Sequence, residues 1–235
     1  MNQKYNALFT PWKICNVEIP NRIVQCSMGG TSLFGWMEPS HLDKEAAYFL
    51  LNRAQDGVGL ILPGMQCIKD PILGRWLYQN DKMFKDLEVY MKEFHKTGSK
   101  LFIQLAAGMG RSMAITKPMV MLLKNPLLGK IASPIADLDY ITASASATPN
   151  RWYEEIKSRP MTIQEIHDQV DAFAKTAKKL MDAGVDGVEI HAVHEGYLLD
   201  QFTISNMNYR TDEYGGSFEN RYRFPVEIVQ AIKAA

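Results

Sequence analysis

Residues 162–191, TIQEIHDQVDAFAKTAKKLMDAGVDGVEIH, decide the fold, because they predict a helix followed directly by a strand. The helix is expected over residues 162–183, with Thr162 and Glu165 forming a capping box and Gly184 lying just past the end. The strand is expected over residues 187–191, a short apolar run. A helix that leads into a buried strand is the basic step of an alternating α/β fold.

The same alternation continues on both sides of this stretch. Strands are expected at residues 22–26, 59–62 and 100–105, and helices at residues 43–55, 81–97 and from 218 to the end. Four successive βα units imply parallel strands covered by helices, either as an open doubly wound sheet or as a barrel. The first strand lacks the G-x-G-x-x-G of a dinucleotide-binding fold. Polar or glycine-rich residues end every strand, where both architectures place their sites.

Composition excludes several classes of function. Lys+Arg and Asp+Glu both number 26, which argues against a broad nucleic-acid surface. The three cysteines are widely spaced and form no C-x-x-C, so we expect no disulfide framework and no zinc or iron–sulfur site within this chain, in a reducing cytoplasm. The start of the chain has no secretory signal, and the most apolar run, residues 118–131, is too short to span a bilayer. We therefore expect neither nucleic acid nor membrane as a partner.

The residues that follow the fourth strand carry the richest chemistry. His191, His194, Glu195 and Tyr197 lie within seven residues of each other. An imidazole can donate a hydrogen bond to a carbonyl oxygen, and a tyrosine hydroxyl can donate a proton. Together they suit hydride addition to an activated C=C bond. The residues equally allow metal ligation, as in a metal-dependent barrel lyase, or simple loop polarity, although the spacing is not that of H-E-x-x-H.

A charged loop, residues 208–224, comes next along the chain. Gly215 and Gly216 predict a tight turn, and Ser217 predicts a helix N-cap. The side chains of Arg210, Asp212, Glu219, Arg221 and Arg223 are expected to form an ion-pair lattice that fixes the loop. The loop is thus interpreted as a structural frame that does not touch substrate.

Several motifs resemble the old yellow enzyme family of FMN-dependent NAD(P)H:flavin oxidoreductases, of the 2-enoate reductase type. They are NRIV at 21–24 with Met28, FIQL at 102–105, GVEIH at 187–191, GYLL at 196–199 and RTDEYGGS at 210–217. The resemblance implies a (β/α)8 TIM barrel, of which this chain supplies the first four βα units and an N-terminal hairpin at residues 13–20. Residues 1–235 would then be the N-terminal half of the FMN-binding barrel, with an insertion at about 112–160.

The resemblance also implies roles for individual residues. Ser27, Met28 and Gly29 would lie along the flavin ring, Gly64 would let the flavin approach, and Gln104 would bind the pyrimidine edge of the ring. His191 would bridge flavin and substrate carbonyl, His194 would complete the carbonyl-binding pair, and Tyr197 would protonate the substrate. For Met28, Gly64 and Gln104 the alternative is packing inside the barrel. Glu195 is an insertion relative to the family pattern, and Gly29 stands where some members carry Cys or Thr.

The implied activity is reduction of the C=C bond of α,β-unsaturated carbonyl or carboxylate compounds, with NAD(P)H as reductant. The family's flavin-binding arginine and phosphate-binding loops belong to later strands, so the chain is expected to be a fragment of a longer protein. A non-catalytic fragment, paired with a missing C-terminal half or with itself as a homo-oligomer, is the alternative. An iron–sulfur (4Fe-4S) cluster and FAD are expected only in a longer parent protein.

Overall fold

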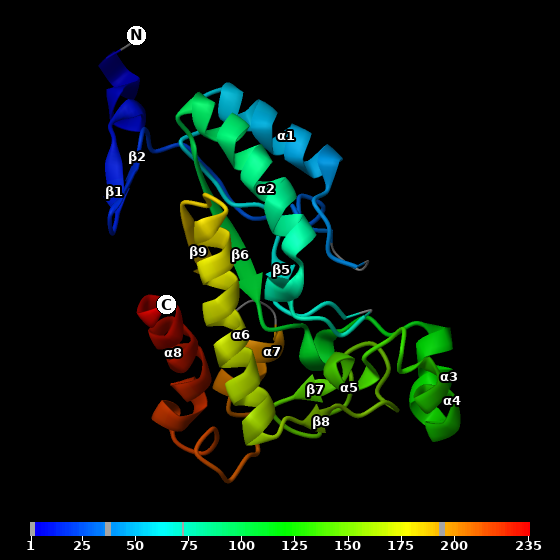
Figure 1. The fold of residues 1–235 in the computed structure, drawn as a ribbon. Coiled ribbons are helices and arrows are strands. Elements are labelled where there is room, and N and C mark those ends of the chain that lie inside the picture. The colour runs from blue at the N-terminus through cyan, green and yellow to red at the C-terminus, as the bar shows by residue number, and fades with distance from the viewer. Residues whose placement is uncertain (1–2, 36–38, 72, 193–195) are drawn as a thin grey trace.

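A five-stranded parallel sheet organises the computed structural model, which describes residues 3–35, 39–71, 73–192 and 196–235. Four of its strands are neighbours in chain order: β3 (Val24–Gln25), β4 (Leu60–Ile61), β6 (Lys100–Ala106) and β9 (Gly187–Ile190) (Figure 1). A further short strand, β5 (Gln66–Cys67), pairs with the last residues of β6. All four expected strands are confirmed, and their order is that of the first four strands of a TIM barrel.

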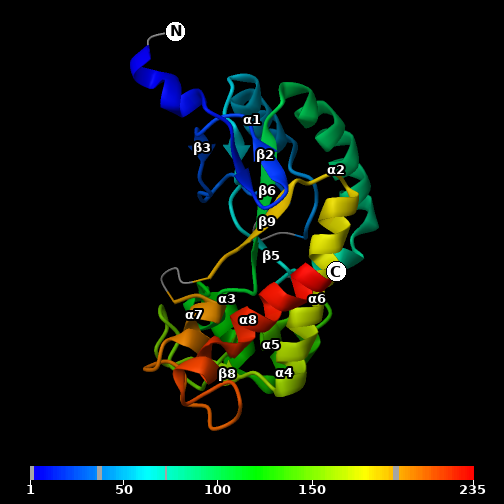
Figure 2. The same cartoon turned by 90° about the vertical axis from the view of Figure 1, so that its left-hand side faces the viewer.

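Helices follow the strands as expected: α1 (Lys44–Gln55), α2 (Asp81–Phe94), α6 (Ile163–Asp182) and α8 (Phe218–Ala234). In two views at right angles, α1 and α2 lie along one part of the sheet, and α6 and α8 lie together along another (Figures 1 and 2). The predicted capping box is present, because Thr162 Oγ1 accepts from Glu165 N at 3.2 Å and Glu165 Oε2 accepts from Thr162 N at 2.8 Å. Gly184 ends α6 with a positive φ of 91°, a conformation that favours glycine.

The core lies between these helices and the sheet. Phe173 and Leu180 of α6 and Phe224 and Ile228 of α8 are completely buried. Each such side chain stabilises the fold by about 1.5–3 kcal/mol relative to exposure. Phe202 packs edge-on against Phe224 at 5.0 Å between ring centroids, which ties the loop region after β9 to the last helix.

The N-terminal segment begins with a 3₁₀ helix, η1 (Gln3–Phe9), and continues as an antiparallel hairpin of β1 (Trp12–Ile14) and β2 (Val17–Ile19). Ile19 is completely buried in a small cluster with Leu60, Leu62 and Phe102. Leu60 and Phe102 lie at or near the starts of their strands. The predicted hairpin therefore packs at the amino-terminal end of the sheet, away from the strand ends that carry the candidate chemistry.

The segment between β6 and α6 is more ordered than its Pro-, Ser- and Ala-rich composition indicates. It contains η4 (Gly110–Ser112), α3 (Lys117–Lys124), α4 (Pro126–Ala132), α5 (Leu138–Ile141) and the parallel pair β7 (Ala143–Ser144) and β8 (Arg159–Pro160). Asn125 and Asp137 cap α4 and α5 with their side chains. The segment forms a separate group of elements beyond the carboxyl-terminal end of β6 (Figure 1).

Two further short helices were not expected from the sequence, η2 (Leu77–Gln79) and α7 (Leu198–Thr203). None of the helices in the described ranges combines the length and the apolarity needed to cross a membrane. Cys15, Cys26 and Cys67 are all free thiols, as expected.

Candidate active site

A cavity of about 400 Å³ lies at the carboxyl-terminal ends of the parallel strands. Its walls include every described residue that the sequence assigned to the site: Ser27, Met28, Gly29, Gly64, Gln104, His191 and Tyr197. These residues come from the ends of β3, β4, β6 and β9, so the fold brings together positions up to 170 residues apart. His194 and Glu195 lie outside the described residues. His194 is the predicted second ligand of the substrate carbonyl, and the alternative of a metal site depends on both residues.

Gln104, on β6, is the centre of a polar cluster in this cavity. Its side-chain oxygen accepts from Ser27 Oγ at 2.9 Å and from Nδ1 of His191 at 3.1 Å. Its side-chain nitrogen donates to Glu189 on the neighbouring strand β9. Because a carboxylate can only accept, Glu189 fixes which way round the amide of Gln104 lies.

Glu189 is a cavity residue that the sequence analysis missed. Its position in the strand could have predicted this, because Glu189 and His191 are two residues apart. Residues at that spacing lie on the same face of a strand. The register pairs Gln104 with Glu189 directly across the two strands. The cavity therefore holds an acceptor-only group next to the predicted flavin-binding amide.

His191 and Tyr197 lie against each other on the cavity wall. Their ring centroids are 5.2 Å apart and the rings are tilted by 36°. The backbone N–H of His191 donates to Leu105 O at 2.7 Å, which extends the pairing of β9 with β6 and holds the imidazole at the strand end. Two groups that can donate a proton or a hydrogen bond thus share one part of the cavity.

The loop that carries Tyr197 is held by the first turn of α7. Asp200 Oδ2 accepts from Gly196 N at 2.9 Å and from Tyr197 N at 3.1 Å. Asp200 is 2% exposed, so both hydrogen bonds form away from water. The carboxylate therefore fixes the backbone from which the Tyr197 ring projects.

Gln201 supports the same loop from beneath and is completely buried. Its oxygen accepts from Ser144 Oγ at 2.6 Å and from Arg111 N at 3.1 Å, and its nitrogen donates to Met109 O at 2.9 Å and Gly196 O at 2.5 Å. One amide thus joins the loop after β6, strand β7 and the loop before α7. No periodicity in the sequence signals this role, because the partners come from three separate segments.

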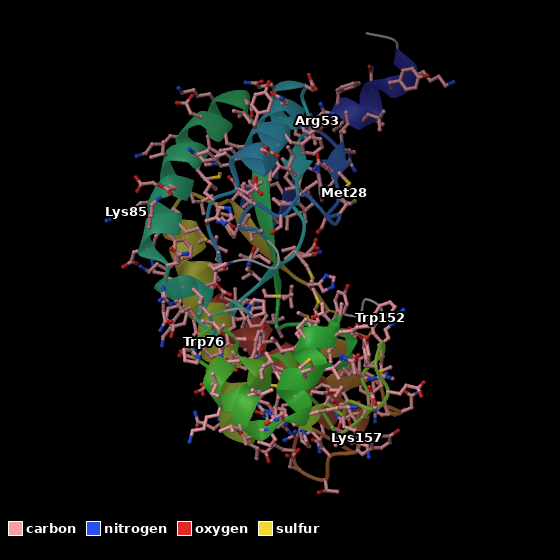
Figure 3. All side chains as sticks on the ribbon, turned by 90° about the vertical axis from the view of Figure 1, so that its right-hand side faces the viewer. Met28, Arg53, Trp76, Lys85, Trp152 and Lys157 are labelled. Carbon is pink, nitrogen blue, oxygen red and sulfur yellow. The ribbon has the colours of Figure 1, made fainter. Side chains whose placement is uncertain are left out.

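The two predicted glycines of the cavity have different environments. A Cβ on Gly64 would lie 2.6 Å from Met28 O and 2.9 Å from Ser32 N, so only glycine allows the backbone after β4 to pack against the loop after β3. This contact supports the packing interpretation of Gly64 without excluding a cofactor beside it. A Cβ on Gly29 would meet nothing within 4 Å, which leaves open space beside that residue. Met28 is 48% exposed, at the surface in Figure 3.

Two titratable groups that line a separate small pocket, Cys67 and Tyr140, are held neutral. Burial, with a contribution from Asp70, raises the pKa of the Cys67 thiol to about 12. Burial also raises the pKa of Tyr140 well above its usual value, and the Tyr140 hydroxyl donates to Ala107 O at 2.9 Å. Since the thiolate is the reactive form of cysteine, Cys67 is not a nucleophile at neutral pH.

The charged loop at residues 208–224 is a frame, but only part of the expected ion-pair lattice forms. Arg210 is nearly buried and pairs with Asp212 at 2.5 Å, and its guanidinium also donates to Ala145 O and Met161 O. Arg221 and Arg223 donate to the backbone oxygens of Thr203, Gly216 and Glu213. These arginines bind carbonyl oxygens instead of carboxylates because the loop's peptide groups turn toward them, so the lattice prediction was wrong for Arg221 and Arg223. Ser217 is the N-cap of α8, as expected.

The chain matches known proteins over almost its whole length. The NADH:flavin oxidoreductase / NADH oxidase family matches residues 7–235. Cinnamate reductase of Clostridium sporogenes is 38% identical over an alignment of 240 positions, which covers 99% of this chain and 33% of that protein. An NADPH dehydrogenase of Bacillus velezensis is 35% identical over 96% of this chain and 60% of its own length.

A solved structure shows the same fold. The old yellow enzyme from Pichia sp. AKU4542 superposes with a TM-score of 0.73 at 26% identity, over 97% of this chain and 56% of that one. The chain thus spans between one third and three fifths of the length of these relatives. The match in sequence and fold, over almost the whole chain, places it in the NADH:flavin oxidoreductase / NADH oxidase family.

Proposed function

We propose that the full-length protein reduces the C=C bond of small α,β-unsaturated carbonyl or carboxylate compounds, with NAD(P)H as reductant and FMN as cofactor. The observation that carries this proposal is the contact of His191 with Tyr197 on the wall of a cavity that also holds Gln104. The name of one relative, cinnamate reductase, fits an unsaturated carboxylate as substrate class. The three free thiols fit a reducing cytoplasm.

The described residues fit the ring of FMN. The Gln104 amide offers hydrogen-bonding groups to a heterocycle edge, and the open space beside Gly29 leaves room for a planar group. In this proposal Ser27, Met28 and Gly29 line the ring, Gly64 forms part of the floor, and Gln104 and His191 hold its polar edge. FMN, when bound, supplies the hydride.

The side chains of this chain then position the substrate and transfer the proton. His191, whose Nδ1–H donates to Gln104, donates in its imidazolium form from Nε2 to the carbonyl oxygen of the substrate, which polarises the C=C bond. Tyr197 donates its hydroxyl proton to the α-carbon as the hydride reaches the β-carbon. His194 is proposed as the second donor to the carbonyl oxygen.

The test uses the purified full-length protein. We expect the absorbance of oxidised flavin at roughly 450 nm, its bleaching by NADH or NADPH, and its return when an unsaturated carboxylate such as cinnamate is added under anaerobic conditions. A flavin-free protein, or a flavin that NAD(P)H reduces but that no unsaturated carbonyl or carboxylate reoxidises, would overturn the proposal.

The 235-residue chain alone gives a second test. β9 pairs only with β6 among the described strands, and all four of its residues are partly exposed, so the described residues leave one side of the site without a wall. We expect FMN to bind the isolated chain weakly or not at all. Tight stoichiometric binding in a fluorescence titration would contradict the proposal that residues outside this chain hold part of the cofactor.

A further inference from the structure

The helical hairpin of α3 and α4, residues 117–135, exposes large apolar side chains. Met121 is 64%, Leu127 68%, Ile131 69% and Ile135 65% exposed. None of the eight residues of α3 is buried, although most of them are apolar. Single exposed apolar residues are common on protein surfaces, but a group within fifteen consecutive residues marks an interaction site.

The hairpin is a formed structure with a defined outer face. Gly129 lets the helices approach closely, because a Cβ there would lie 3.0 Å from Leu122 O, and Asn125 caps α4 at the turn. Ala132, at the end of α4, is buried. In Figure 1 the two helices project at the edge of the molecule, and Figure 3 views that side. The four exposed side chains therefore point outward from a fixed support.

The charge of the hairpin has one sign. Residues 117–136 include Lys117, Lys124 and Lys130 and no aspartate or glutamate. Lys124 pairs with Glu155 at 2.6 Å, whereas Lys117 and Lys130 form no ion pair with any described residue. Exposed apolar side chains between unneutralised lysines are the pattern of an element that lies in the interface of an anionic membrane.

We propose that the α3–α4 hairpin docks on an anionic lipid surface. Met121, Leu127, Ile131 and Ile135 enter the boundary between headgroups and acyl chains, while Lys117 and Lys130 reach the phosphates. The element lies on the surface and does not cross the bilayer. This partner differs from the sequence expectation, which considered the same apolar run only as a spanning segment. The lysines favour lipid over a second copy of this chain, because two copies would bring these like charges together.

Vesicle flotation of the full-length protein tests the proposal. We expect binding to phosphatidylcholine vesicles that contain phosphatidylglycerol, weak binding to pure phosphatidylcholine, and release by salt. The variant Leu127→Ser/Ile131→Ser should lower binding to anionic vesicles roughly tenfold or more, and Lys117→Gln/Lys130→Gln by a similar factor. These side chains are exposed, so thermal unfolding should be unchanged.

A matched control comes from α2, where Val89 is 65% exposed and Lys85 is also on the surface. Lys85→Gln/Val89→Ser should bind vesicles like the wild type. No vesicle binding by the wild type, or equal loss in this control, would overturn the proposal.

Light scattering tests the competing occupant, a second copy of this chain. A dimer that Leu127→Ser/Ile131→Ser dissociates, in a protein that does not bind vesicles, would assign the hairpin to a second copy. Neither result depends on the flavin chemistry proposed above.

Discussion

The side-chain oxygen of Gln104 lies 3.1 Å from Nδ1 of His191, so two neighbouring strands share a hydrogen bond at the cavity wall. Because Glu189 takes the amide nitrogen of Gln104, the oxygen must face the imidazole. An amide oxygen only accepts, and therefore Nδ1 of His191 carries a proton. The strand register thus selects the tautomer of the histidine that we propose to bind the substrate carbonyl.

This tautomer can be measured. Two-bond ¹H–¹⁵N correlation spectra of the imidazoles should show a protonated Nδ1 for His191 in the wild type. In Glu189→Gln the amide of Gln104 is no longer oriented by an acceptor-only partner, and we expect a mixture of the two tautomers. The signals of His167, which lies in α6, contacts Tyr214 at 3.1 Å and does not line the cavity, serve as the internal control. An Nε2-protonated neutral His191 in the wild type would contradict the assigned network.

Replacing Tyr197 separates the two half-reactions of the proposed enzyme. Tyr197→Phe retains the ring next to His191 but removes the hydroxyl proton. Stopped-flow measurements on the full-length protein should show unchanged flavin reduction by NAD(P)H and flavin reoxidation by the unsaturated substrate slowed by about 10²–10⁴-fold. If reoxidation keeps its wild-type rate, the proton comes from another group and the proposed role of Tyr197 fails.

Gln201 should contribute strongly to stability. Gln201→Leu leaves the buried Ser144 hydroxyl and the backbone N–H of Arg111 without this partner, and we expect a loss of about 2–4 kcal/mol in the free energy of unfolding. Gly110→Ala should also destabilise, because its Cβ would lie 2.1 Å from Gln201 Oε1. Urea denaturation measures both variants. Gln164→Leu on the exposed side of α6 is the control, and its free energy of unfolding should change by no more than about 0.5 kcal/mol. A similarly small change in Gln201→Leu would show that Gln201 does not stabilise the loop.

Glu165 should make stability depend on acid. Hydrogen bonds from the Arg159 guanidinium, with a further bond from Thr162 N, lower the pKa of Glu165 from 4.5 to about 2. A lowered folded-state pKa means that the stabilisation is fully present above the unfolded-state pKa and is lost as the pH falls toward 2. Unfolding measured across this range should therefore be less pH-dependent in Glu165→Gln than in the wild type. Glu45→Gln in the first turn of α1 should retain the wild-type dependence, and equal slopes in all three proteins would contradict the assignment.

The strands and most of the cavity could be predicted from the sequence, because their signals are local. Ser27, Gln104 and His191 each lie in or directly after a short apolar run, and parallel strands bring their ends together. Glu189 could have been predicted from its spacing of two residues to His191. A strand whose apolar and polar residues do not alternate clearly, however, does not indicate which of its two faces points into the cavity. The capping box of Thr162 and Glu165 was predictable for the same local reason.

The rest depends on contacts between distant segments. Gln201 looks like any polar residue in a short helix until Ser144 and Met109 are placed around it. The arginines of the charged loop bind backbone oxygens, and the direction of a carbonyl depends on the path of the chain, which residue types do not encode. The side chain of Asn125 caps α4 in a composition that otherwise indicates irregular structure, whereas Thr116 at the start of α3 makes no capping hydrogen bond.

The chain-order arrangement of β3, β4, β6 and β9 also bears on how the molecule forms during synthesis. Each strand adds to the edge left by the one before it, so the sheet can grow as the chain leaves the ribosome. Of the three side-chain partners of the Gln104 amide, only Ser27 precedes it in the chain, whereas Glu189 and His191 come with β9. Docking of β9 delivers Glu189 and His191 to that amide in one step, so the polar cluster assembles at the moment the fourth parallel strand is added.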